Sequence, residues 1–216
     1  MNPFNKYKRL KAFGLRKTGN ILRISIRDKN LEFCTIVANH FRQMTDIEVI
    51  HGDLFCSKAD AVVSPANSFG DMGGGVDRAI DNFYQGNAQQ KARSAIIGHF
   101  LGELPVGMAH ILEMESKKFP HLILAPTMRV PGKLEQTSIN AYLAMRAMLV
   151  QVHLFNKRSN DSIQTIAMPG LGIGVGGMAY EQAAFQMLTA YHNIIGGRLE
   201  ADRSPYAGTV QEVGKA

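Results

Sequence analysis

Long apolar runs are missing from this 216-residue sequence. No stretch approaches the roughly 18 consecutive apolar residues that a membrane-spanning helix needs, so we expect no membrane contact. The basic N-terminal residues also lack the continuous apolar core of a secretion signal. With only Cys34 and Cys56, which would pair only by geometric accident, the sequence predicts reduced thiols and a cytoplasmic protein.

Several signatures of known chemistry are also missing. The seven histidines show no metal-ligand spacing with the two cysteines, so we expect no metal. Ser64 and Ser68 lack the context of a nucleophile elbow. The late glycine-rich loop has no Lys-Ser/Thr and is therefore no P-loop, and its loose G-x-G-x-x-G lacks the later acid of a dinucleotide fold. We therefore expect no cofactor.

Positive charge is unevenly distributed along the chain. Residues 1–29 hold nine Lys/Arg against the single acid Asp28, whereas the remaining 187 residues hold 15 basic and 17 acidic groups. We divide the chain into a basic arm (1–20), one α/β domain (21–195) and a flexible tail (196–216) that loses hydrophobic periodicity. The arm suits weak nucleic-acid contact; a solvated leader that improves solubility is the simpler alternative.

Apolar periodicity predicts alternating strands and helices in the central domain. Strands are expected at 21–26, 47–51, 60–65, 106–113, 121–125 and 163–168, and helices at 31–44, 76–84, 87–101, 135–155 and 180–194. This alternation favours a three-layer α/β/α fold with a largely parallel or mixed sheet. Two glycine loops each follow a strand and precede a helix, so we expect them at the same edge of the sheet, where ligands bind.

The first glycine loop, Gly73, Gly74 and Gly75, directly precedes a helical pattern that begins at Val76. Glycine allows close approach of the backbone to a ligand, and a helix start offers unpaired N–H groups to an anion. We therefore predict a phosphate or diphosphate held by backbone. Asp77 would either favour the helix dipole or orient and deprotonate a water near a sugar carbon.

Other candidate residues each have two interpretations. Asp53, at a strand end, either caps the next turn or accepts from the exocyclic amine of a nucleobase. Asn67 either holds its own turn or reads ribose hydroxyls. The second glycine loop, residues 170–177, has five glycines whose neighbouring N–H groups could form an anion-binding nest.

Taken together, these segments resemble the macro domain family, whose members bind ADP-ribose. The resemblance rests on Gly52-Asp53-Leu54, Ser64-Pro65-Ala66-Asn67, Gly73-Gly74-Gly75-Val76-Asp77 and the loop Gly170–Gly177, and it covers about residues 20–195. It looks closest to a divergent bacterial and phage branch of the Appr-1-p processing type. It implies the macro-domain mixed sheet flanked by helices, with ADP-ribose or an ADP-ribosylated substrate as partner.

The resemblance also implies roles for individual residues. Asp53 would accept from the adenine amino group, Asn67 would bind the distal ribose, and Asp77 would lie near the anomeric carbon. Asn67 and Asp77 are thus the expected catalytic pair. The full set of expected ligand contacts is Asp53, Leu54, Ala66, Asn67, Gly73, Gly74, Gly75, Val76, Gly172, Ile173, Gly174, Val175 and Gly176.

Two residues depart from the family pattern. Ser64 stands at the first Asn of the Asn-x-Ala-Asn loop, and Gly176 stands where many members carry an aromatic that packs on the distal ribose. Losing such stacking costs about 1 kcal/mol, which predicts weaker binding and room for a bulkier ligand. The leading hypothesis is a hydrolase of ADP-ribosyl linkages on mono-ADP-ribosylated targets or small ADP-ribose derivatives. The alternatives are a reader without turnover and a nucleic-acid or assembly module.

Overall fold

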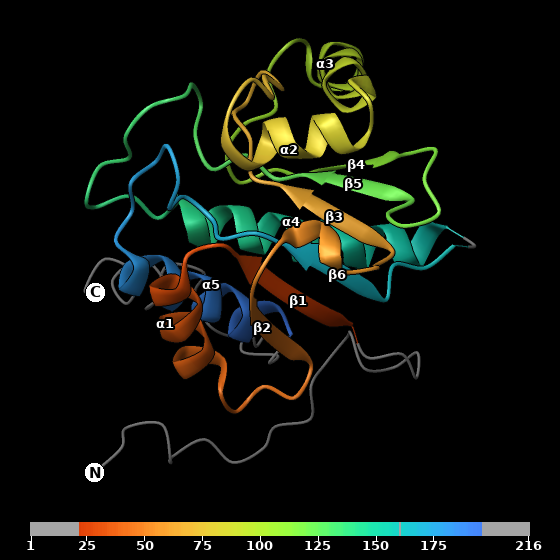
Figure 1. Cartoon of the computed structure of the whole chain (residues 1–216). Coiled ribbons are helices and arrows are strands. Elements are labelled where there is room, and N and C mark those ends of the chain that lie inside the picture. The colour runs from red at the N-terminus through yellow and green to blue at the C-terminus, as the bar shows by residue number, and fades with distance from the viewer. Residues whose placement is uncertain (1–21, 160, 196–216) are drawn as a thin grey trace, which may run out of the picture.

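The computed structural model describes residues 22–159 and 161–195, which form a six-stranded sheet between two layers of helices (Figure 1). The basic arm of residues 1–20 and the tail of residues 196–216 lie outside the described residues. The strands are β1 (Arg23–Asp28), β2 (Ile47–His51), β3 (Ala61–Ser64), β4 (His110–Glu113), β5 (His121–Leu124) and β6 (Thr165–Met168). The helices are α1 (Leu31–Phe41), α2 (Gly75–Phe83), α3 (Asn87–Phe100), α4 (Asn140–Arg158) and α5 (Tyr180–Ile194), with a 3-10 turn, η2 (Leu54–Cys56).

The sheet has the strand order β2-β1-β6-β3-β5-β4. All neighbouring strands are parallel except β4, which runs antiparallel to β5 at one edge. The carboxyl ends of β1, β2, β3, β5 and β6 therefore share one edge of the sheet, as predicted for a mixed α/β sheet.

Each face of the sheet is covered by its own set of helices. On β3, Ala61 and Val63 belong to the core shared with α1, α4 and α5, whereas Val62 packs in the core shared with α2 and α3. Side chains of a strand alternate between faces, so three consecutive apolar residues supply both cores. Figure 1 shows α2 and α3 together on one side of the sheet and α1 and α5 together on the other. The predicted three-layer α/β/α fold is confirmed.

All six predicted strands and five predicted helices are present, with two notable errors at element starts. The strand predicted from residue 106 begins at His110, because Met108 N–H bonds to the Pro105 carbonyl in a turn where Gly107 has φ +96°. The helix predicted from 135 begins at Asn140, whose side chain donates to the Thr127 carbonyl. Across residues 22–159 and 161–195, the helices are too short or too polar to cross a membrane.

Candidate functional site

A cleft of about 750 Å³ opens beyond the carboxyl ends of the parallel strands. Its lining includes residues 27–30 at the end of β1, 52–55 after β2, parts of 65–79 after β3, parts of 127–131 after β5 and parts of 169–180 after β6. This volume falls within the roughly 300–1,000 Å³ of typical small-ligand sites. Every residue predicted to contact a ligand lines this cleft, and both glycine loops lie at the same edge, as expected.

The first glycine loop leads directly into α2. Gly75 begins the helix with φ +55°, a conformation that residues with a Cβ rarely adopt. No described residue accepts a hydrogen bond from the backbone N–H of Gly75, Val76 or Asp77. These donors, at the positive end of the α2 dipole, are available to an anion in the cleft.

Asp77, in the first turn of α2, lines the cleft beside this loop. The hydroxyl of Ser64, at the end of β3, donates to Asp77 Oδ1 at 2.7 Å. Burial raises the pKa of Asp77 to about 6, and the charge of Asp71 adds to the rise, whereas the Ser64 hydrogen bond opposes it. Asp77 is therefore a carboxylate that titrates near neutral pH inside a cleft, a property typical of general acids and bases.

Asn67 holds its own loop, the simpler of its two predicted interpretations. Its Oδ1 accepts from the N–H groups of Phe69 and Asp71 at 3.1 and 3.2 Å, and its Nδ2 donates to the Asp71 carbonyl at 2.8 Å. The side chain is buried yet lines the cleft. One amide hydrogen thus remains for a ligand, since an Asn amide carries two.

The second glycine loop, between β6 and α5, also lines the cleft. No described residue accepts a hydrogen bond from the backbone N–H groups of residues 172–176. A Cβ on Gly176 would lie 2.5 Å from the Gly172 carbonyl oxygen and 3.0 Å from Leu134 Cδ1. Any side chain at 176 would therefore require the backbone of this loop to shift.

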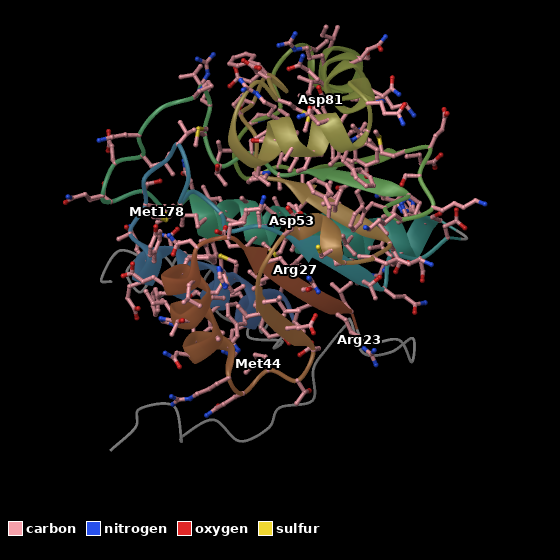
Figure 2. The ribbon with its side chains drawn as sticks, in the orientation of Figure 1. Arg23, Arg27, Met44, Asp53, Asp81 and Met178 are labelled. Atoms are coloured by element: carbon pink, nitrogen blue, oxygen red, sulfur yellow. The ribbon has the colours of Figure 1, made fainter. Side chains whose placement is uncertain are left out.

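Asp53 caps η2, as the capping interpretation predicted. Its Oδ1 accepts from Phe55 N–H at 2.8 Å, and Lys29 Nζ lies 2.9 Å from its Oδ2. The Lys29 ammonium and the Phe55 N–H hold the pKa of Asp53 below its ordinary value. Asp53 and Arg27, which both line the cleft, are labelled near the centre of Figure 2. A nucleobase at this end would meet a carboxylate already paired with a lysine.

The sequence reasoning missed the contribution of β1 to the cleft. Asp28 Oδ1 accepts from Asn30 N–H at 2.9 Å, and Asp28 Oδ2 accepts from Gly170 N–H at 3.4 Å. Asn30 caps α1 through Phe33 N–H and donates to the Tyr180 hydroxyl at 2.8 Å. The sequence carries a signal for this contribution, because Asp28 ends a strand, and Lys29 and Asn30 follow it at the sheet edge where ligands bind.

In the part of the chain that the structure describes, no group of three or more His, Cys, Asp or Glu residues is placed to hold a metal ion. Cys34 and Cys56 are free cysteines, and burial raises the pKa of the Cys34 thiol. The polar groups described above in the cleft are carboxylates, amides and backbone N–H groups.

Comparison with protein families matches residues 63–187 to the Macro domain. An uncharacterized protein of Aquifex aeolicus (strain VF5) is 35% identical over 143 residues, which cover 66% of this chain and 79% of that protein. An uncharacterized protein of Aeropyrum pernix is 35% identical over 142 residues, covering 64% of this chain and 66% of that protein.

Solved structures show the same architecture. The Oceanobacillus iheyensis macrodomain with ADP superposes with a TM-score of 0.56 at 21% identity, over 67% of this chain and 73% of that chain. The macrodomain of Mycobacterium tuberculosis DarG gives a TM-score of 0.52 at 21% identity, over 67% and 88%. Thermosipho africanus DarTG in complex with ADP-ribose gives 0.52 at 16% identity, over 78% and 50%. At these identities the likeness establishes the fold.

Proposed function

The chain belongs to the macro domain family, and from this premise we propose that its cleft binds ADP-ribosyl groups and hydrolyses the bond that joins them to a target. Two of the structural neighbours, the Oceanobacillus iheyensis macrodomain with ADP and Thermosipho africanus DarTG in complex with ADP-ribose, hold such ligands. The cleft of this chain has the volume and the donor groups that such a ligand requires.

The proposed ligand spans the cleft from the Asp53 end to the Asp77 end. The adenine lies beside Asp53 and Leu54, and its amino group donates to a spare lone pair of the carboxylate. The diphosphate lies between the two glycine loops, where the unpaired N–H groups at the start of α2 and of residues 172–176 can bind its oxygens. The distal ribose then lies near Asn67, whose remaining amide hydrogen can donate to a hydroxyl.

The proposed reaction is attack by water on the anomeric carbon of the distal ribose. The water oxygen bonds to that carbon while the bond from the carbon to the oxygen of the target breaks. Asp77 accepts a proton from the water and returns it to the leaving oxygen, so one water is consumed and ADP-ribose and free target are released. A carboxylate with a pKa of about 6 is suited to both transfers near neutral pH.

The single observation that carries the proposal is Asp77, a cleft-lining carboxylate beside the unpaired N–H groups of α2. The test is release of ADP-ribose from a mono-ADP-ribosylated protein by the wild type, Asp77→Ala and Asn67→Ala, quantified by chromatography. We expect Asp77→Ala to lose at least about a hundredfold in rate while still binding ADP-ribose. A wild type no faster than both variants contradicts hydrolysis.

A second candidate function is an ADP-ribose reader without turnover. The observation that favours it is Asn67, whose carbonyl oxygen and one amide hydrogen are committed to its own loop. Calorimetry separates the two functions, because a reader binds ADP-ribose and releases nothing from a modified protein. If neither ADP-ribose nor AMP binds, both functions are wrong.

A further inference from the structure

We propose that Ser64 is a positioning residue, which holds one carboxylate oxygen of Asp77 and keeps the other turned to the cleft as a charged proton acceptor. The inference deepens the proposed function and rests on it for the identity of the reaction. It concerns a residue that departs from the family pattern and does not itself line the cleft.

The backbone of Ser64 is fixed by the sheet. Ser64 is the last residue of β3, pairs in register with Leu124 of β5, and accepts Ala125 N–H at 3.0 Å. Its side chain is fully buried, and its hydroxyl donates to Asp77 Oδ1 at 2.7 Å. Because a buried strand end is among the most rigid parts of a fold, this hydroxyl gives Asp77 a fixed anchor.

The hydrogen bond also determines which oxygen is free. No other hydrogen bond from the described residues reaches the Asp77 carboxylate, and Asp77 lines the cleft. The anchored Oδ1 therefore leaves Oδ2 as the oxygen for a water or a ribose hydroxyl. Loss of the Ser64 hydroxyl would allow the carboxylate to rotate and would leave both oxygens without a protein donor.

The charges around Asp77 make this single donor important. Asp71, in the loop between β3 and α2, raises the pKa of Asp77 and is itself 3.8 Å from Arg93 of α3. Arg78, the next residue of α2, points its guanidinium to the Gly73 carbonyl. The Ser64 hydroxyl is the group that opposes the rise caused by burial and by Asp71. Without this hydrogen bond, the pKa of Asp77 would be higher, and the carboxyl group would stay protonated and uncharged up to a higher pH.

The chain offers a closely matched control four residues away. Ser68 is as fully buried as Ser64, but its hydroxyl has no hydrogen-bond partner among the described residues. Ser64→Ala and Ser68→Ala therefore remove the same atom from equally buried positions, and only the first removes a donor to Asp77. Both variants shorten a side chain without adding volume, so neither introduces a clash.

The first measurement is the titration of the Asp77 carboxyl carbon by NMR in the full chain, with Asp77→Asn used to assign the signal. We expect the midpoint in Ser64→Ala to move to higher pH and the midpoint in Ser68→Ala to match the wild type. An unchanged midpoint in Ser64→Ala overturns the inference. This measurement requires no turnover.

The second measurement is the pH profile of ADP-ribose release, with binding of ADP-ribose measured in parallel. We expect Ser64→Ala to lose about tenfold or more in kcat near pH 6 and to recover most of it near pH 9, where Asp77 is ionised in either protein. A loss of equal size at every pH indicates a merely structural role and overturns the inference. If the wild type binds without turnover, the proposed hydrolysis fails, and the NMR midpoint alone decides the role of Ser64.

Discussion

The backbone N–H of Leu134 donates to the carbonyl of Gly176 at 2.8 Å, and this bond joins the segment after β5 to the second glycine loop. The same segment reaches the loop after β3, because Ser68 N–H bonds to the carbonyls of Met128 and Arg129. Figure 1 shows the segments after β5 and β6 side by side at the edge of the molecule. Residues 127–134, the bridging segment, thus connect the two sides of the cleft.

The first prediction concerns the crowding at Gly176. Gly176→Ala should lower the free energy of unfolding by about 2 kcal/mol or more, because the new Cβ meets the Gly172 carbonyl oxygen. Urea denaturation followed by circular dichroism measures the change. Gly174→Ala is the control for stability, since its Cβ would meet nothing within 4 Å, and its effect should stay within about 0.5 kcal/mol. Equal losses in both variants would contradict the packing argument.

The second prediction concerns the bridging segment. Leu134→Ala should cost about 1 kcal/mol in stability and weaken ADP-ribose binding several-fold, because the second glycine loop loses the side chain that packs beside Gly176. Hydrogen exchange should show faster exchange in residues 172–176. Val130→Ala, in the same segment but with a side chain 54% exposed, should leave both properties near those of the wild type. Matching effects in the two variants would show that Leu134 has no special role.

The third prediction follows from the raised pKa of Asp77. The folded protein holds this proton up to about pH 6, whereas the unfolded chain releases it near its ordinary value of 3.8. Within that window the folded state binds more protons, so the free energy of unfolding falls as pH rises. Asp77→Asn should therefore exceed the wild type in stability by about 2–3 kcal/mol near pH 7.5 and by little near pH 4. A constant difference between these two pH values would argue against a buried charge.

The fourth prediction concerns the ion pair between Lys29 and Asp53. Lys29→Met frees Asp53 Oδ2 for a donor on the base, so the affinity for adenosine, which has no phosphate, should rise about two- to threefold at low salt. The difference should shrink in high salt, where the exposed pair of the wild type is screened. Lys58→Met removes an exposed lysine that does not line the cleft and should have no such effect. Weaker adenosine binding in Lys29→Met would show that the lysine assists the base.

Local periodicity was enough to predict the layers of this fold. Apolar positions such as Ile24 and Ile26 alternate along a strand, and every second side chain of that strand packs into one core. It failed at residues 106–109 and 135–139, where local hydrogen bonds, Met108 N–H to Pro105 O and Ser138 N–H to Glu135 O, form turns directly before the strand and the helix begin. The cleft residues after β2, β3 and β6 were accessible through motifs, whereas those at the end of β1 were not. The bond between Ser64 and Asp77 was not, because no local pattern states which side chain meets another 13 residues away.

The position of β1 in the sheet has a consequence for the biosynthesis of this protein. β1 lies between β2 and β6, with Ile24 paired to Ile166, so one of the central ladders of the sheet joins an early strand to the last one. Such distant pairing makes folding slow, because loop closure precedes the stabilising contacts. On the ribosome, β1 to β5 would emerge with one neighbour of β1 still absent. The proposed nucleotide site therefore stays incomplete until β6 and its glycine loop have left the exit tunnel, and any binding that needs both glycine loops can begin only when synthesis of the domain is nearly complete.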